Sequence, residues 1–283
     1  MPELPEVETV RRGLAQLVVG RRVAGVDVLN PGSFTAGVPL AGLTFMRARR
    51  RAKMLLLDMD DGHTLAVHLK MTGQLVVRGV DAWGGGHPSD SLIGDLPDRS
   101  TRVIVDLDDG SRLFFNDQRK FGWMRLMTRE DVDALTTGFG PEPMDKDAWP
   151  RFRQRVRRHE RTAIKAALLD QTVVAGIGNI YADEALWAAR VHPQTRVGAL
   201  SDKALRRVLE AAASVMTLSI DLGGSTDRNY VDAEGRRGAY LDFAQVFRRE
   251  GLPCNRCGTL LVKTRVAGRG THLCPKCQRV PRA

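Results

Sequence analysis

Residues 254–277 read CNRCGTLLVKTRVAGRGTHLCPKC and contain all four cysteines of the 283-residue chain. Cys254 and Cys257 form one C-x2-C pair, Cys274 and Cys277 form another, and sixteen residues separate the pairs. Such turns place four thiolates around a tetrahedral metal, and the alternating residues around Gly268–Gly270 predict a β-hairpin between them. Two disulfides are the alternative, which a reducing cytosol disfavours. The pattern predicts one structural zinc, because four thiolates leave no open position for a substrate.

The charge and hydropathy of the whole chain indicate the class of partner. The chain has 43 Lys and Arg against 33 Asp and Glu, a net charge of +10. A basic surface gains free energy by releasing counterions from nucleic acid, so a polyanionic partner is expected. No apolar run approaches the roughly 20 residues of a membrane helix, and the start is acidic where a secretory signal is basic. We therefore expect a cytoplasmic protein with no membrane segment.

The first half of the chain has the pattern of a β-sandwich preceded by one helix. Pro5 suits the first position of a helix that Gly20 would end. Short alternating runs follow at 23–29, 53–58, 64–69, 103–107 and 112–115, and Asp-Gly pairs at 61–62 and 109–110 are typical of hairpin turns. The Gly-, Pro-, Asp- and Ser-rich stretch 79–98 predicts a mobile loop.

The second half is predicted to be helical, with a boundary between the halves near residues 139–143. Helices are expected over 162–170, 180–190 and 201–221. Six arginines between positions 151 and 161 occupy several helix faces, so most are expected to be solvated. The fold class is therefore α+β, with an N-terminal β-sandwich, a helical domain and a zinc-binding β-hairpin.

Residues 175–182 read AGIGNIYA and lie between two predicted helices. Two glycines followed by Asn179 at a helix start would direct backbone N–H groups at an anion, as in a phosphate-binding helix-two-turn-helix. A tight turn without a ligand is the alternative for this segment taken alone.

The N-terminal segment offers a nucleophile. Removal of Met1 would leave Pro2 with a free secondary amine, whose pKa near 8 leaves more of it unprotonated than a lysine at neutral pH. Condensation with an aldehyde-level carbon gives a cationic iminium that acidifies the neighbouring C–H. Glu3, Glu6 and Glu8 are close enough in sequence to move protons. Taken singly, Pro2 and Glu3 are ordinary residues of a first helical turn.

Together, MPELPEVET at residues 1–9, GIGNIYA at 176–182 and the four-cysteine finger resemble the formamidopyrimidine-DNA glycosylase family of base-excision repair. The resemblance runs along the whole chain. It implies a bifunctional glycosylase and AP lyase that removes oxidised purines (8-oxoguanine and formamidopyrimidines) from duplex DNA, acts on abasic sites, and needs no cofactor beyond zinc. It also implies a monomer in the bacterial cytosol or nucleoid.

The resemblance assigns catalytic roles to four residues. Pro2 would attack C1′ and form the Schiff base, and Glu3 would be the acid/base that opens the sugar. Lys53 would contact a phosphate and serve in β-elimination; a solvated lysine is the alternative. Arg269 would serve in δ-elimination, although a simple phosphate clamp is also compatible with its position.

Further residues are assigned to DNA by the same resemblance. Because the damaged base must leave the stack, something must fill the void. The expected set is Met71, Arg119 and Phe121, although Met71 and Phe121 could instead be core residues. Glu6 would face the flipped base, and Arg228 would lie in a loop that closes over it. The residues that would contact the DNA are Asn179, Arg161 and Arg102. Arg102 stands where relatives carry histidine.

The implied domains are the catalytic β-sandwich at 2–130, a linker at 131–148, a helix-two-turn-helix domain at 149–225, a lesion-capping loop and connector at 226–247, and the zinc finger at 248–283. Two other functions stay open at this point. One is a non-enzymatic zinc-ribbon DNA-binding protein, and the other is a glycosylase that prefers oxidised pyrimidines.

Overall fold

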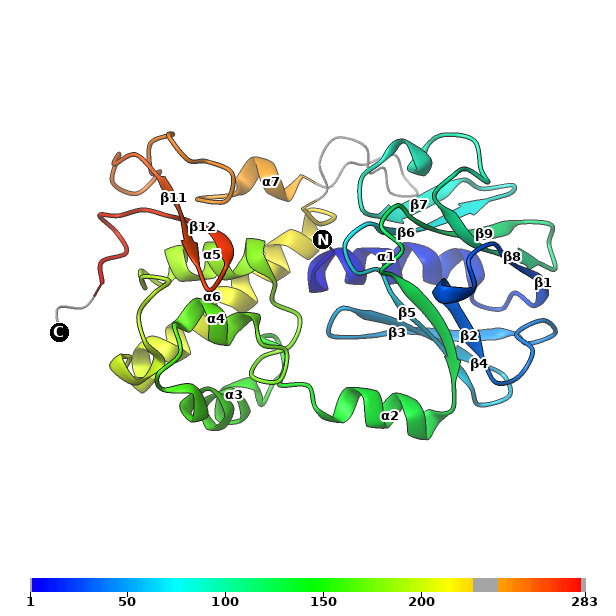
Figure 1. Ribbon diagram of the computed structural model, residues 1–283, viewed down its shortest axis with the longest axis horizontal. Helices are drawn as coiled ribbons and strands as arrows, with labels where there is room; N and C mark the ends of the chain where they lie inside the picture. Colours follow the sequence, from blue (N-terminus) through cyan, green and yellow to red (C-terminus); the bar gives the residue numbers. More distant parts are fainter. Residues whose placement is uncertain (1, 226–238, 281–283) are drawn as a thin grey trace. The chain divides into compact units, whose positions relative to one another are not determined.

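The computed structural model describes residues 2–225 and 239–280. The chain divides into two compact units. Unit 1 comprises Met1–Thr137 and Ile220–Ala239, and unit 2 comprises Gly138–Ser219 and Tyr240–Ala283. Unit 1 is the β-rich part and unit 2 contains most of the helices (Figure 1). Helix α6 (Asp202–Asp221) therefore ends where the chain returns to unit 1, which no local sequence signal predicted.

Helix α1 (Leu4–Val18) begins unit 1. Pro5 lies in its first turn, and Glu3 precedes the helix as its N-cap. The residues Leu4, Val7, Val10, Leu14 and Val18 are fully or almost fully buried, so the helix presents one apolar stripe at the spacing that the 3.6-residue period requires. The helix ends before Gly20, whose φ of 87° lies in the left-handed region that favours glycine.

Two five-stranded sheets form the sandwich of unit 1. The first has the strand order β1-β8-β9-β6-β7, made by Val23–Val28, Thr101–Leu107, Arg112–Asp117, Gly73–Arg78 and Trp83–Gly86. The second has the order β2-β10-β5-β4-β3, made by Phe34–Ala36, Trp123–Met127, Thr64–His68, Met54–Met59 and Phe45–Arg51. Helix α1 packs along the edge strands β7 and β3 and contributes to the core between the sheets (Figure 1). The predicted sandwich with a leading helix is confirmed.

The stretch 79–98 is more ordered than the predicted mobile loop. It contains edge strand β7 and the 3-10 turn η2 (Asp90–Leu92). The Trp83 side chain is 2% exposed and lies on α1, where any side chain larger than hydrogen at Gly13 would meet the indole ring at about 2.5 Å. One tryptophan thus anchors a segment whose composition indicates a loop.

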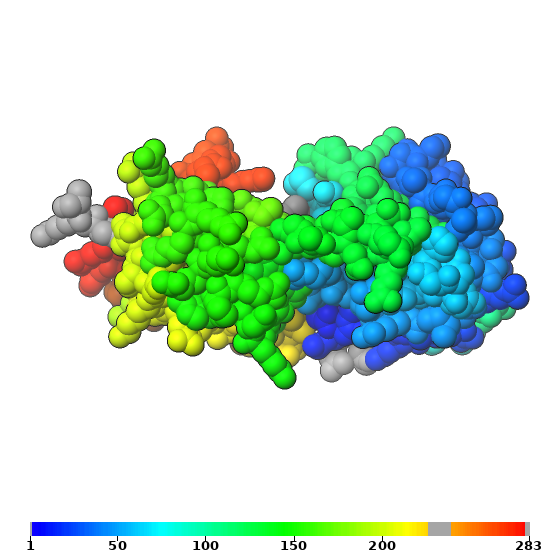
Figure 2. Space-filling view, turned by 90° about the horizontal axis from the view of Figure 1, so that it is seen from below, coloured from blue at the N-terminus to red at the C-terminus, as the bar shows by residue number. Residues whose placement is uncertain are grey.

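Helix α2 (Arg129–Thr137) covers the outer face of the second sheet. Its Val132 is buried against Leu56 and Ala66 of strands β4 and β5. Figure 2 shows α2, in green, lying on the blue strands of this face. Strand β4 is hydrophobic on both faces because one face lies in the core between the sheets and the other packs against α2.

Unit 2 contains the helices α3 (Ala148–Val156), α4 (Ile164–Leu169), α5 (Asn179–Ala188), α6 (Asp202–Asp221) and the short α7 (Tyr240–Phe243). It also contains the 3-10 turns η3 (Arg157–His159) and η4 (Val197–Ala199), whereas the 3-10 turn η1 (Pro31–Ser33) belongs to unit 1.

Three of the arginines expected to be solvated make specific contacts. Arg153 and Arg157 bind Asp202 at the start of α6 at 2.5 and 2.6 Å, and Arg155 donates to the Thr172 carbonyl at 2.7 Å. Across residues 2–225 and 239–280, no helix combines the length and the apolar character that crossing a bilayer requires.

The finger hairpin consists of β11 (Val262–Val266) and β12 (Arg269–Leu273). Its turn is one step earlier than predicted. Ala267 and Gly268 have φ values of 48° and 75°, as in a two-residue type I′ turn, and Arg269 is the first residue of β12, paired with Val266.

Candidate functional site

The N-terminal candidates are held by reciprocal hydrogen bonds at the start of α1. Pro2 is buried, and Glu3 and Glu6 are 2% and 6% exposed. The Glu3 N–H donates to Glu6 Oε2 at 2.8 Å, and the two residues form a capping box. Glu6 Oε1 also accepts from the Ser225 N–H at 2.8 Å and from the Ser225 hydroxyl at 2.7 Å. Pro2 is therefore joined to a fixed helix end, and Glu6 ties this end to the chain just before residues 226–238.

Lys53 lies in the tight turn between β3 and β4, where Ala52 has a φ of 53°. Lys53 is only 8% exposed, so the solvated alternative does not describe it. His68, at the end of β5, pairs with Met54 and lies close enough to Lys53 to be affected by the lysine charge. Burial, with the positive charges of Lys70 and Lys53, lowers the pKa of His68 to about 3, so its imidazole is neutral at physiological pH. Its Nδ1 accepts the Lys70 N–H at 3.0 Å. No motif in the sequence marks His68 as a candidate.

The three residues predicted to fill the void lie together. Arg119 Nη1 is 3.0 Å from Met71 Sδ, and the Arg119 guanidinium carbon lies 4.9 Å from the centre of the Phe121 ring. Met71 is 38% exposed and Phe121 is 53% exposed, so neither is a core residue. The cluster therefore projects from unit 1 as two adjacent turn tips that carry a thioether, a guanidinium and an aromatic ring.

Arg102 is directed into unit 1. It is 8% exposed, and its Nε donates to the Asp117 carbonyl at 2.8 Å. This position supports a structural role beside the Arg119 turn and makes Arg102 a weaker candidate for a phosphate contact than the exposed arginines. Arg228 lies outside the described residues.

Asn179 is the first residue of α5, and Gly178 is the N-cap. Its Nδ2 donates to the Gly270 carbonyl at 3.0 Å, and its buried Oδ1 has no hydrogen-bond partner among residues 2–225 and 239–280. The Gly176 N–H is not directed to solvent as predicted, because it donates to Gln171 Oε1 at 2.9 Å. Asn179 is thus hydrogen-bonded to Gly270, the residue that follows Arg269 in the hairpin. Arg269 and Arg161 are both exposed.

Two adjacent acidic residues of α5 attach the finger and the segment just before it to the helices of unit 2. Asp183 is fully buried, lies 2.6 Å from Lys165 Nζ and accepts the His272 N–H at 2.9 Å. Glu184 accepts the N–H groups of Val246 and Phe247 at 2.8 Å, and burial raises its pKa. Neither residue was among the predicted site residues, although two adjacent acids in the apolar stretch 179–188 are a visible signal.

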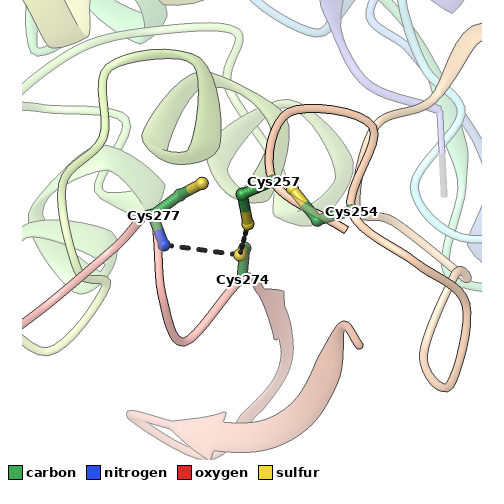
Figure 3. Close-up of side chains that lie close together, drawn as sticks. All are labelled: Cys254, Cys257, Cys274 and Cys277. Carbon is green, nitrogen blue, oxygen red and sulfur yellow. Dashed lines mark hydrogen bonds between the residues drawn. The ribbon is translucent and has the colours of Figure 1, made fainter. Parts of the chain in front are cut away.

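The four cysteines form a metal site. Their sulfur atoms all lie within 4.8 Å of one another (Figure 3), and none forms a disulfide. Burial and the hydrogen bonds with Cys257 and Cys274 raise the pKa of Cys277 to about 12, and a cation held among the four sulfur atoms would favour its thiolate. Trp187 Nε1 donates to Cys254 Sγ at 3.4 Å, which supports the sulfur ligand from outside. The donor set and spacing fit one structural zinc, as predicted.

Comparison with known proteins shows which family carries this arrangement. Residues 1–124 match the model of the formamidopyrimidine-DNA glycosylase N-terminal domain, residues 139–230 match the H2TH domain of the same enzymes, and residues 251–280 match a zinc finger found in FPG and IleRS. The formamidopyrimidine-DNA glycosylase of Herpetosiphon aurantiacus is 43% identical over 98% of this chain and 100% of its own length. The chain belongs to the formamidopyrimidine-DNA glycosylase family.

Solved structures of relatives agree with this assignment. A Lactococcus lactis FPG mutant in complex with Fapy-dG-containing DNA superposes with a TM-score of 0.86 at 34% identity, covering 98% of this chain and 100% of that one. A MutM complex with carbocyclic 8-oxo-G-containing DNA has a TM-score of 0.85 at 33% identity, with the same coverage. The chain is therefore a DNA glycosylase of base-excision repair whose partner is DNA, and the non-enzymatic alternative is disfavoured.

Proposed function

We propose that this chain removes oxidised purines from duplex DNA through a Schiff base at Pro2 and then cleaves the strand by β,δ-elimination. The observation that carries the proposal is the buried Pro2-Glu3 start, fixed by the capping box with Glu6. The relatives that were solved with Fapy-dG and 8-oxo-G DNA support the substrate class.

The chemistry requires the amine of Pro2 after removal of Met1. Its nitrogen attacks C1′, the bond from C1′ to the damaged base breaks, and the base leaves with the bonding electrons and takes up the proton that the Pro2 nitrogen releases. Glu3 delivers a proton as the sugar ring opens, and the product is an iminium cation between Pro2 and C1′. Loss of a C2′ proton to a base then expels the 3′ phosphate, and a second elimination expels the 5′ phosphate. The zinc takes no part in these steps.

Other residues position the strand in this proposal. Lys53 holds a phosphate near the lesion and serves in β-elimination, and Arg269 does the same for δ-elimination. Asn179 and Arg161 contact phosphates, and Met71, Arg119 and Phe121 occupy the void. Arg102 supports the Arg119 turn from inside unit 1 through the Asp117 carbonyl. Glu6 faces the extruded base, with Arg228 in the loop over it. The two neighbouring lysines around a neutral His68 support a phosphate site at the β3–β4 turn.

The division of labour follows the predicted domains. The sandwich (2–130) carries the chemistry, 131–148 links it to the helix-two-turn-helix domain (149–225), and 226–247 and the finger (248–283) complete the DNA contacts. We further propose that the protein acts as a monomer in the bacterial cytosol.

The substrate class is tested by single-turnover base release from duplexes that contain 8-oxoguanine, a formamidopyrimidine or thymine glycol. We expect the two purine lesions to react faster by about 10-fold or more, because a pocket that hydrogen-bonds one base edge rejects another. The strand products should carry phosphate at both ends of the gap. Faster release of thymine glycol would instead establish the alternative preference for oxidised pyrimidines.

A further inference from the structure

Two surface turns of unit 1 lie side by side because of strand register. The first turn joins β5 to β6 and carries Met71; the second joins β9 to β10 and carries Arg119 and Phe121. Strands β6 and β9 are paired in the first sheet, with Gly73 opposite Asp117. Strands β5 and β10 are paired in the second sheet, with His68 opposite Trp123. Each turn therefore connects the β5–β10 pair of the second sheet to the β6–β9 pair of the first sheet, so the two turns are neighbours.

Each turn is sterically constrained. In the first, the Gly73 N–H donates to the Leu69 carbonyl at 2.8 Å, and a Cβ at Gly73 would lie 2.4 Å from that oxygen. In the second, a Cβ at Gly122 would meet the Phe115 ring at 2.8 Å. These close approaches leave each backbone little freedom, but they do not connect one turn to the other.

The connection is made by Thr72 and Asp117. Asp117 is fully buried and Thr72 is 9% exposed. The Thr72 hydroxyl donates to Asp117 Oδ1 and accepts the Arg119 N–H at 3.0 Å. Asp117 Oδ2 accepts the Gly122 N–H at 2.6 Å. One hydroxyl and one carboxylate thus bind the first turn to the beginning and the end of the second.

The exposed side chains at the tips of the two turns are also in contact with one another. Met71 and Arg119 are in contact through sulfur and guanidinium, and Arg119 lies over the Phe121 ring. Separate turns would have to be ordered by the DNA, at a cost in conformational entropy that preorganisation removes.

We propose that Thr72 and Asp117 form a buried clamp that holds Met71, Arg119 and Phe121 as one preformed wedge, which makes Thr72 a positioning residue for base extrusion. This inference rests on the proposed function, in which the three side chains fill the void left by the damaged base. Thr72 itself touches neither the lesion nor the reacting atoms in this account. Its hydroxyl acts through Asp117 and the Arg119 backbone.

The test compares Thr72→Val with Thr72→Ser. Valine has nearly the shape of threonine but no hydroxyl, whereas serine retains the hydroxyl. Two single-turnover rates are measured: base release from a fully paired 8-oxoguanine duplex, and β-elimination at an abasic site in single-stranded DNA, which needs no extrusion. A 2-aminopurine base opposite the lesion reports wedge insertion by fluorescence, and thermal unfolding shows that each variant is folded.

We expect Thr72→Val to slow base release from the duplex by about 10-fold to 100-fold, because small misplacements of positioning groups have effects of this size. The 2-aminopurine signal should be delayed equally, whereas cleavage of the single-stranded abasic site should stay within about twofold of the wild type. Thr72→Ser should match the wild type in all assays.

Two results would overturn the clamp: wild-type duplex rates in Thr72→Val, or equal losses on the duplex and the single strand, which indicate a general structural role. Failure of the proposed function would look different. Wild-type protein would then release no oxidised purine from the duplex, and both proposals would fall together.

Discussion

Replacement of Pro2 by glycine is expected to lower single-turnover release of 8-oxoguanine by at least about 10³-fold, because loss of a covalent nucleophile removes the pathway that it opens. Glycine still offers an amine, but it is a primary amine on a more flexible backbone. Pro2, by contrast, offers a secondary amine and is buried just before α1. Strand cleavage should fall with base release, since both depend on the same iminium.

Pro5→Ala is the matched control. Pro5 is a second buried proline in the same segment and lies in the first turn of α1. Its replacement should change stability slightly and leave the rate within a few-fold of the wild type. If Pro2→Gly and Pro5→Ala were equally active, or equally impaired with altered circular dichroism, the nucleophilic role of Pro2 would be refuted.

Replacement of Cys277 by alanine is expected to unfold the finger locally and to abolish lesion-DNA binding. Binding of a structural zinc supplies folding free energy of about 10 kcal/mol or more in small zinc domains, so loss of a ligand costs a large part of it. The Asn179 contact to Gly270 and the Lys165 contacts to Gly270 and Thr271 depend on the same hairpin. Zinc content, hydrogen exchange of residues 251–280 and DNA-binding anisotropy measure the effect.

Cys277→His is the control for this prediction, since Cys3His is an established structural zinc set and Cys277 is only half-buried. It should retain zinc and most DNA affinity. A zinc-free Cys277→Ala protein that still binds lesion DNA with wild-type affinity would show that the finger is dispensable.

The parts of the fold that sequence predicted are those set by local chemistry. The helix at Leu4–Val18 has its apolar stripe, its N-terminal proline and Gly20. The hairpin turns have their Asp-Gly pairs, and the zinc site has its two C-x2-C turns. Each signal lies within a few residues of the structure that it predicts, so no knowledge of distant contacts was needed.

The remaining parts depend on contacts between distant residues. Trp83 orders an otherwise loop-like stretch only because Gly13 on α1 leaves room for the ring. Asp117 has no motif of its own, and its role follows from the opposition of Gly73 and Asp117 in two strands. Lys165 and Asp183 bind residues of the finger that lie 105 and 89 positions further along the chain. Single-sequence patterns carry no information on such pairs.

The central claim is that the α-nitrogen of Pro2 bonds to C1′ of the damaged nucleotide. Borohydride reduction during reaction with an 8-oxoguanine duplex converts the iminium into a stable amine, and digestion with mass spectrometry then locates the linkage. The account predicts one adduct at Pro2, absent in Pro2→Gly and retained in Lys53→Ala. An adduct at a lysine, or undiminished trapping after the α-amine is chemically blocked, would contradict it.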